Sequence, residues 1–210
     1  MYTLYFAPGA ASMLPHLVLL ETGAAHRLEK VDTAAGAQRS PEYLKLNPAG
    51  VVPTLVEDGR AMAESAAIAM LVAERHPESG LVPPPGDASR ATFLSWTFAL
   101  ANTLQPTFRH WWYPAEAAGE ANIDAAKAQT RTKIEKFWDR LDAHLAANGP
   151  YIAGAKPTLA DLYATMLMRW SRNMPKPALE WPHLKALADR VRARPSWKTL
   201  YEREGLTEWA

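Results

Sequence analysis

The segment with the clearest capacity for chemistry runs from Asn47 to Leu55 and carries the pair Val52-Pro53. Proline cannot donate to a central strand ladder, so we expect Pro53 where strand pairing begins or at a cis peptide bond. A cis Val52-Pro53 bond would turn the N–H and C=O of Val52 outward, where they could pair with an extended peptide. The segment therefore predicts a main-chain edge that binds a short peptide. The alternative is that Pro53 only ends an edge strand.

A second pair, Glu64-Ser65, opens an apolar periodic segment that is typical of a helix. The free N–H groups at a helix start favour a carboxylate, with the Ser65 hydroxyl as a further donor and Glu64 available for an ammonium group. The alternative is that Ser65 only caps the helix. Together the two pairs predict a peptide-binding edge with a carboxylate site close behind it.

Composition limits the chemistry that the chain can perform. The 210 residues carry a net charge of +1 with interspersed signs, which gives no reason to expect nucleic acid or a membrane surface as a partner. The sequence shows neither a signal peptide nor an apolar run of ~18 residues, so we expect a cytoplasmic protein. Cysteine is absent, which excludes cysteine nucleophiles, thiolate metal sites and dithiol redox cycles. Any reactive sulfur must therefore arrive on the substrate.

The hydrophobic pattern predicts a mixed α/β arrangement in the first part of the chain, in the order βαβαββα. The expected strands cover residues 2–6, 28–31, 52–56 and 60–62, with a hairpin at Asp58-Gly59. The expected helices cover residues 13–20, which Ser12 precedes and Gly23 closes, 41–46 and 65–75. A proline-rich stretch follows that cannot continue a helix. We expect an α/β domain over 1–77, a linker over 78–87 and an all-helical domain over 88–210.

The helical domain shows one long periodic segment and one capped helix start. Apolar residues between Ile134 and Leu145 keep a 3.6-residue period that ends at Asn148-Gly149-Pro150. Thr158 and Asp161 have the spacing of a capping box at the start of the next helix. We expect Asp161 to cap this helix rather than to act as a catalytic acid, because its spacing from Thr158 already explains its charge.

The turn Tyr5 to Ser12, the Asn47 to Leu55 run, Glu64-Ser65 and the Thr158 to Asp161 cap resemble a cytosolic glutathione S-transferase of the bacterial beta type. The resemblance covers nearly the whole chain. It implies a thioredoxin-like N-terminal domain, an all-helical C-terminal domain, a homodimer, and glutathione as co-substrate with no metal.

The resemblance also implies a glutathione site. It assigns Val52 to the cysteinyl backbone of glutathione, implies that Pro53 is a cis proline, and assigns Glu64 and Ser65 to the γ-glutamyl end. The catalytic positions match less well, since Ala11 stands where the beta type usually has cysteine. In the helical domain Gln105 takes the place of a frequent histidine and Phe98 that of an asparagine. These departures argue against mixed-disulfide chemistry.

Ser12, at the mouth of the first helix, is the expected donor to the glutathione thiolate. Lowering a thiol pKa by about two units requires about 2.7 kcal/mol. One hydroxyl hydrogen bond to a charged acceptor contributes about 1.5 to 3 kcal/mol, so Ser12 suffices on magnitude. Tyr5 is the competing donor, and a plain N-cap is the alternative for Ser12. We expect His16 to pack or bond locally rather than act as a base.

An aromatic run in the helical domain predicts an apolar acceptor site. It comprises Phe108, Trp111, Trp112 and Tyr113, and Trp170 could approach it from the capped helix. The alternative is that these rings belong to the core or to a dimer contact. The sequence thus predicts conjugation of the glutathione thiolate to hydrophobic electrophiles. Other hypotheses are a glutathione-dependent isomerase, dehalogenase or etherase, or a ligand-binding module without turnover.

Overall fold

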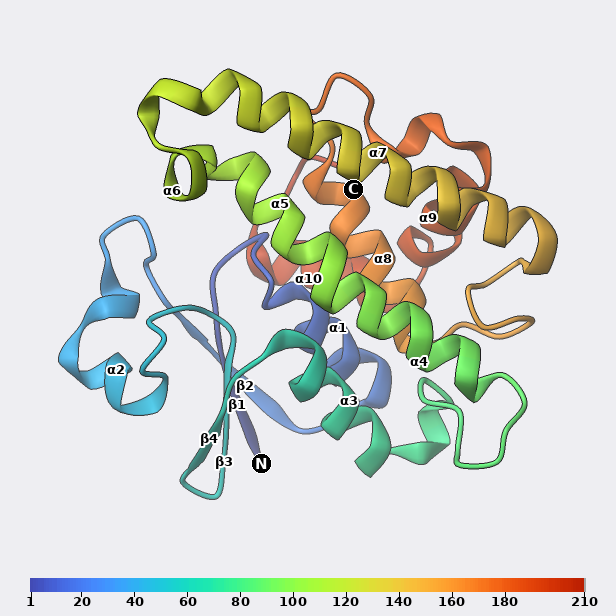
Figure 1. Ribbon diagram of the computed structural model, residues 1–210. Coiled ribbons are helices and arrows are strands. Elements are labelled where there is room, and N and C mark those ends of the chain that lie inside the picture. Colours follow the sequence, from blue (N-terminus) through green and yellow to red (C-terminus); the bar gives the residue numbers. More distant parts are fainter. Residues whose placement is uncertain (210) are drawn as a thin grey trace. The chain divides into compact units, whose positions relative to one another are not determined.

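The structure, a computed structural model, describes residues 1–209 and divides into two compact units (Figure 1). Unit 1 comprises Met1–Val82 and the C-terminal segment from Arg192, and unit 2 comprises Pro83–Val191. The expected helical domain over 88–210 differs from this division at its end. The C-terminal segment groups with unit 1 because its residues pair with the first helix, as Arg194 does with Glu21.

Unit 1 contains a four-stranded mixed sheet in the order β2-β1-β3-β4. The strands are β1 (Tyr2–Phe6), β2 (His26–Lys30), β3 (Thr54–Glu57) and β4 (Arg60–Met62). β1 runs parallel to β2 and antiparallel to β3, and β3 pairs with β4 in a hairpin. Asp58 and Gly59 both have positive φ, at 49° and 77°, which is the backbone that a tight hairpin turn requires. The predicted thioredoxin-like order βαβαββα is confirmed.

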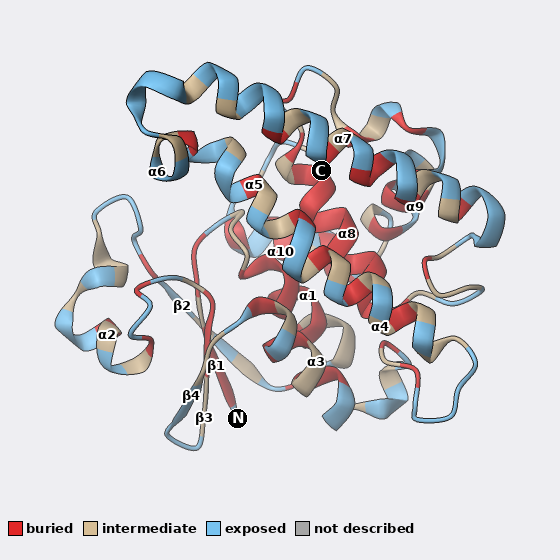
Figure 2. Cartoon of the chain, viewed as in Figure 1, coloured by how far each residue is buried: buried red, intermediate tan, exposed pale blue. Residues whose placement is uncertain are grey.

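The helices of unit 1 are α1 (Met13–Thr22), α2 (Pro41–Leu46), α3 (Ser65–Arg75) and α10 (Pro195–Glu204), with short 3-10 turns η1 (Ala37–Arg39) and η2 (Pro77–Ser79). α1 contacts β1, α3 and α10, and every residue from Met13 to Leu19 is buried, as the colouring in Figure 2 shows. A helix that is apolar on all sides belongs in a core. α1 ends, as predicted, at Gly23 in the left-handed conformation.

Unit 2 is helical over most of its length. Its helices are α4 (Arg90–Ala99), α5 (Gln105–Trp112), α6 (Pro114–Ala118), α7 (Ile123–Asn148), α8 (Leu159–Trp170) and α9 (Pro182–Arg192), with 3-10 turns η4 (Glu120–Asn122) and η5 (Ala178–Glu180). α8 is the most buried of these helices, since each residue from Leu159 to Arg169 lies in the core (Figure 2). α7 ends at Asn148, where the Asn-Gly-Pro sequence predicted it.

A π-helical turn, η3 (Leu100–Leu104), joins α4 to α5 and was not predicted. In this turn the N–H of Gln105 bonds to the C=O of Leu100. Pro106 explains the wider turn, because a proline ring clashes with the carbonyl four residues earlier and lacks an N–H to donate.

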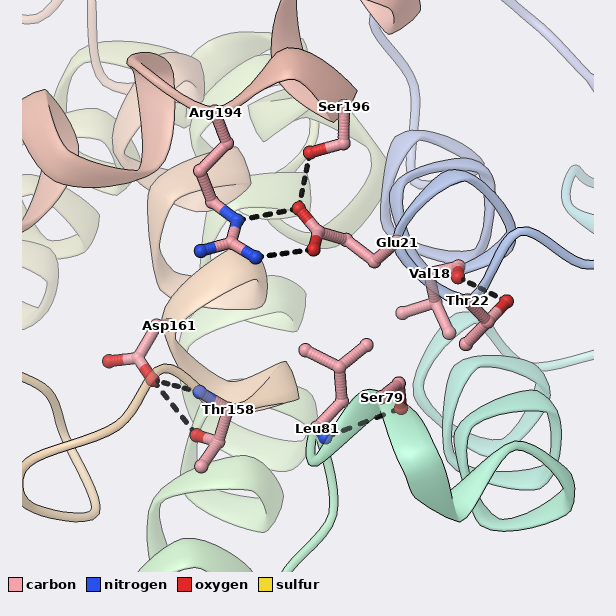
Figure 3. A network of polar contacts seen from close by, with 9 residues as sticks. All are labelled: Val18, Glu21, Thr22, Ser79, Leu81, Thr158, Asp161, Arg194 and Ser196. Atoms are coloured by element: carbon pink, nitrogen blue, oxygen red, sulfur yellow. Dashed lines mark hydrogen bonds and ion pairs between the residues drawn. The ribbon is translucent and has the colours of Figure 1, made fainter.

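Asp161 caps α8, as the sequence predicted (Figure 3). One carboxylate oxygen accepts the Thr158 N–H at 2.7 Å and the Thr158 hydroxyl at 2.9 Å, and the other accepts the Ile152 N–H at 2.8 Å. Burial raises the pKa of Asp161 to about 6, although these hydrogen bonds oppose the rise. The carboxyl therefore ties the loop before α8 to the helix start.

Candidate functional site

The main chain at Val52 is the first part of the candidate site. The Val52-Pro53 peptide bond is cis, as predicted. Within residues 1–209, neither the N–H nor the C=O of Val52 has a hydrogen-bond partner. The C=O of the preceding Val51, in contrast, accepts from the Tyr43 hydroxyl and the Asn47 amide, both at 2.8 Å. The C=O of Val51 is thus hydrogen-bonded within unit 1, whereas the N–H and the C=O of Val52 could both bond to a ligand.

Tyr43, Asn47 and Thr54 form a buried network under this edge. The Tyr43 hydroxyl lies 2.8 Å from the Thr54 hydroxyl, which also accepts the Asn47 amide at 3.2 Å. Burial raises the pKa of Tyr43 above its ordinary value, so this hydroxyl stays protonated at neutral pH. Sequence reasoning gave these residues no role. The polar Asn47 directly after the apolar end of α2 is the signal that could have identified the network.

The N-terminus of α3 is the second part of the site. The first intrahelical bond joins the Ile68 N–H to the Glu64 C=O, so the amides of Ser65, Ala66 and Ala67 precede the helical ladder. Among the hydrogen bonds of residues 1–209 these three amides have no acceptor. Glu64 is exposed and has φ 73°, a conformation that costs a residue with a side chain about 1 kcal/mol or more. Such a conformation often accompanies ligand sites.

Ser65 and Ser12 are both turned inward. The Ser65 hydroxyl donates to the Ala11 C=O and is buried. The Ser12 hydroxyl, also buried, donates to the Ala7 C=O at 3.0 Å and accepts the Ala7 N–H at 3.2 Å. This placement differs from the role that we expected for Ser12 as thiolate donor, because both functions of its hydroxyl face Ala7. Its side chain does not cap α1 either, and it closes the turn between β1 and α1 instead.

The turn between β1 and α1 still presents polar groups. The amides of Ala11 and Ser12 have no acceptor among residues 1–209, and they lie at the N-terminus of α1. Tyr5 is partly exposed at the end of β1, opposite Thr54 in the register, and its ring meets Tyr43 edge-on at 5.9 Å. The Tyr5 hydroxyl has no hydrogen-bond partner within the described part of the chain.

Glu204 of α10 holds this turn from the far end of the chain. One carboxylate oxygen accepts the Gly9 N–H at 2.9 Å, and the other lies 2.8 Å from Nδ1 of His16. The His16 and Glu204 side chains are both fully buried. We expected His16 to pack or bond locally, but its ring contacts Glu204, which lies 188 positions away in the chain. Glu204 was missed, although it continues the buried face of α10 that Trp197, Leu200 and Tyr201 form at helical spacing.

The aromatic run in unit 2 separates into buried and exposed rings. Phe108 is fully buried and contacts Trp138 and Trp170 at centroid distances of 6.3 and 6.0 Å. It therefore underlies the surface rather than lining it, which differs from the expectation for an acceptor-site residue. Trp112 and Tyr113 are 40% and 56% exposed.

Three further positions noted from the sequence also lie in unit 2. Trp111 is partly buried beneath Lys127 of α7, whose Nζ is 5.6 Å from the ring centroid. Gln105, at the position where the family often has histidine, accepts a hydrogen bond from the Tyr163 hydroxyl. Phe98 is exposed on α4.

Two negative findings concern residues 1–209. No helix in this range is long and apolar enough to cross a membrane. The same range contains no cluster of three or more histidine, aspartate or glutamate side chains placed to hold a metal ion.

Comparison with known proteins identifies the class of this protein. Residues 12–75 match the family described as glutathione S-transferase, N-terminal domain, and residues 96–195 match glutathione S-transferase, C-terminal domain. A glutathione S-transferase of Xanthomonas campestris, GST-4.5, is 34% identical over 204 residues, which cover 97% of this chain and 98% of that protein. The chain belongs to the glutathione S-transferase family.

Solved structures give the same result. A glutathione transferase homologue from Sulfitobacter, crystallised with bound glutathione, superimposes with a TM-score of 0.89 at 28% identity over 99% of both chains. A bacterial beta class glutathione S-transferase from Sphingomonas chungbukensis superimposes with a TM-score of 0.85 at 30% identity, covering 98% of this chain and all of that chain. The predicted likeness to beta-type enzymes is confirmed, although this chain contains no cysteine.

Proposed function

We propose that this glutathione transferase binds glutathione along Val52 and conjugates its thiolate to apolar electrophiles. The observation that carries the proposal is that the N–H and C=O of Val52 and the first amides of α3, all in unit 1, have no partner among residues 1–209. The cysteinyl main chain of glutathione pairs with Val52 next to Pro53 as an added strand. The γ-glutamyl carboxylate binds the first amides of α3, from Ser65 on, and Glu64 binds the γ-glutamyl ammonium.

The thiolate binds at the N-terminus of α1 in this proposal. The amides of Ala11 and Ser12 donate to the sulfur, and Tyr5 is a further donor because its hydroxyl has no other partner in the described chain. Hydrogen bonds to a charged acceptor contribute about 1.5 to 3 kcal/mol each, and a helix start adds a few tenths to about 1 kcal/mol. The sum covers the roughly 2.7 kcal/mol that a two-unit fall in thiol pKa requires. Ser12 then supports thiolate binding indirectly, because the hydrogen bonds of its hydroxyl to Ala7 close the turn that carries the Ala11 and Ser12 amides.

Two measurements on one preparation test this function. Calorimetry gives the glutathione affinity, and absorbance follows conjugation of 1-chloro-2,4-dinitrobenzene. We expect binding and turnover above the uncatalysed rate. Binding without turnover of any electrophile would favour a ligand-binding module, and absence of binding would refute the proposal.

The thiol pKa of bound glutathione, read from thiolate absorbance, assigns the donors. If Tyr5 donates, Tyr5→Phe raises this pKa by about one unit while Ser12→Ala leaves it nearly unchanged in folded protein. If the backbone amides suffice, neither variant moves it. A large shift in Ser12→Ala alone would return the role to the serine hydroxyl.

We also propose that the protein is a homodimer. Val51 and Phe98 are large apolar side chains that remain exposed in the single chain, and a second copy would remove them from water. Sedimentation equilibrium tests this proposal. A monomer at micromolar concentration would refute it.

A further inference from the structure

The hydrogen bonds under the main-chain edge at Val52 have one consistent direction. A tyrosine hydroxyl carries one proton and the C=O of Val51 can only accept, so the Tyr43 hydroxyl donates to Val51 at 2.8 Å. The same hydroxyl then accepts from Thr54, whose oxygen lies 2.8 Å away. The Asn47 amide donates one proton to Val51 at 2.8 Å and the other to Thr54 at 3.2 Å. Two donors therefore converge on the carbonyl of Val51.

This network is buried and fully bonded. Tyr43 and Asn47 are 5% and 3% exposed, and Thr54 is completely buried. Each side-chain proton of the three polar groups has an acceptor, and the remaining atom, Oδ1 of Asn47, accepts the Ala49 N–H at 3.1 Å. A buried network whose donors and acceptors are all satisfied holds its members in one geometry. The direction of the Val51 carbonyl is therefore fixed.

The C=O of Val51 and the N–H of Val52 belong to the same peptide unit. This unit is trans, in contrast to the bond that follows Val52. In a planar trans peptide the C=O and the N–H point in opposite directions. Because Tyr43 and Asn47 hold the C=O inward, the Val52 N–H points away from the network. Hydrogen bonds to a carbonyl also polarise the peptide that carries it, which makes this N–H a stronger donor.

We propose that Tyr43 is a positioning residue for glutathione. Its hydroxyl fixes the Val51 C=O, so that the Val52 N–H meets the cysteinyl carbonyl of the ligand. Because its side chain is buried, Tyr43 acts through this peptide unit and does not contact glutathione. The inference rests on the proposed binding along Val52 and adds the side chain that sets its strength.

The direction of the bonds gives the expected order of the variants. Tyr43→Phe removes one of two donors to Val51 and keeps the ring, with its edge-on contact to Tyr5 at 5.9 Å. We expect it to weaken binding of S-methylglutathione, which has no thiol to ionise, about tenfold, equivalent to about 1.4 kcal/mol. Thr54→Val removes a donor to Tyr43 but none to Val51, so it should cost only about threefold. Thr54→Ser keeps the hydroxyl and should bind as the wild type does.

Loss of a buried hydroxyl also destabilises the fold, so the test includes a matched control. Tyr2 is 6% exposed in the same unit, and its hydroxyl bonds with Arg75 of α3. Tyr2→Phe and Tyr43→Phe should lower the urea midpoint of unfolding to similar extents. Only Tyr43→Phe should raise the dissociation constant of S-methylglutathione in calorimetry. Equal affinities in the two variants would overturn the inference.

A second ligand separates positioning from a general loosening of the site. In an analogue of S-methylglutathione a trans alkene replaces the Cys-Gly amide, which removes the cysteinyl carbonyl that the Val52 N–H would meet. We expect this analogue to bind the wild type more weakly than S-methylglutathione does. In Tyr43→Phe the ratio of the two dissociation constants should fall by about threefold or more, because variant and analogue weaken the same hydrogen bond. Additive effects would mean that Tyr43 acts elsewhere and would overturn the inference.

These measurements distinguish failure of the inference from failure of the proposed function. If the wild type binds both ligands equally, main-chain pairing at Val52 is refuted, and the inference with it. If the analogue loses the same affinity in the wild type and in Tyr43→Phe, only the positioning role is refuted. If both ligands bind as expected but no electrophile is conjugated, only the conjugating function fails. Absence of S-methylglutathione binding would refute both.

Discussion

Replacing Asp161 by asparagine should change how the stability of the protein depends on pH. The Asp161 carboxyl is fully buried and accepts hydrogen bonds from Ile152 and Thr158. Burial favours its neutral form and raises its pKa from 3.8 to about 6 in the folded protein, although the three hydrogen bonds favour the charged form. The folded state therefore binds this proton more tightly than the unfolded state does.

The sign and size of the effect follow from this difference in pKa. Because the folded pKa is raised, protonation of Asp161 stabilises the fold fully below about pH 3.8, and this stabilisation is lost as the pH rises through about 6. The contribution relative to pH 7.5 is about 1 kcal/mol at pH 5 and about 2 kcal/mol at pH 4. Asparagine has no proton to bind, so it removes this contribution. The cost of Asp161→Asn should therefore be larger at acid pH by these amounts.

Urea unfolding of unit 2 at pH 5 and pH 7.5, followed by tryptophan fluorescence, measures the effect. Ile152→Val is the control, because it trims a buried side chain, keeps the backbone N–H on Asp161, and should cost about 0.5 to 1.5 kcal/mol equally at both pH values. If Asp161→Asn costs more at pH 7.5 than at pH 5, the hydrogen bonds outweigh burial and the reasoning is refuted.

Two further predictions concern carboxylates of unit 1. Glu204→Ala should lower the free energy of unfolding by about 2 to 3 kcal/mol, because it removes the contacts of this carboxylate with the Gly9 N–H and with the buried His16 ring. The exposed Glu202→Ala should stay within about 0.5 kcal/mol, and similar losses in the two variants would contradict this role. Burial by itself would raise the pKa of Glu21. The hydrogen bonds from Arg194 and Ser196 (Figure 3), together with the positive charge of Arg194, have the larger effect, so the pKa of Glu21 is lowered. Glu21→Gln should therefore cost about 1 to 2 kcal/mol near neutral pH, and melting curves should show this cost shrinking as the pH falls below 4.5. A cost that does not change with pH would refute the lowered pKa.

Features that depend on neighbours in the sequence could be predicted. The aromatic run of residues 2–6 located β1, the Asp58-Gly59 pair located the hairpin, and the spacing of Thr158 and Asp161 located the start of α8. Each depends on backbone geometry within one or two turns of chain. The cis bond before Pro53 belongs with them, because only proline makes that geometry common.

The orientation of polar side chains could not be predicted. Ser12 stands at a helix start in the sequence, yet its hydroxyl bonds back to Ala7, and Ser65 donates to Ala11 on another segment. Which acceptor a hydroxyl takes depends on distances that exist only after packing. The same holds for Glu204, whose partner Gly9 lies 195 positions away in the chain. Phe108 could not be told from its exposed neighbours, because burial within an aromatic run depends on the helix face that meets α7 and α8.

The return of α10 to unit 1 has a consequence for biosynthesis. A chain leaves the ribosome with its N-terminus first, so a domain made of one continuous stretch can fold during synthesis. Unit 1 cannot complete its structure in this way, since Arg194 and Glu204, which secure α1 and the turn before it, are translated after the whole of unit 2. Unit 2 can therefore fold before unit 1 is complete. The segment proposed to bind glutathione lacks the support of Arg194 and Glu204 until the residues from 192 on have been synthesised.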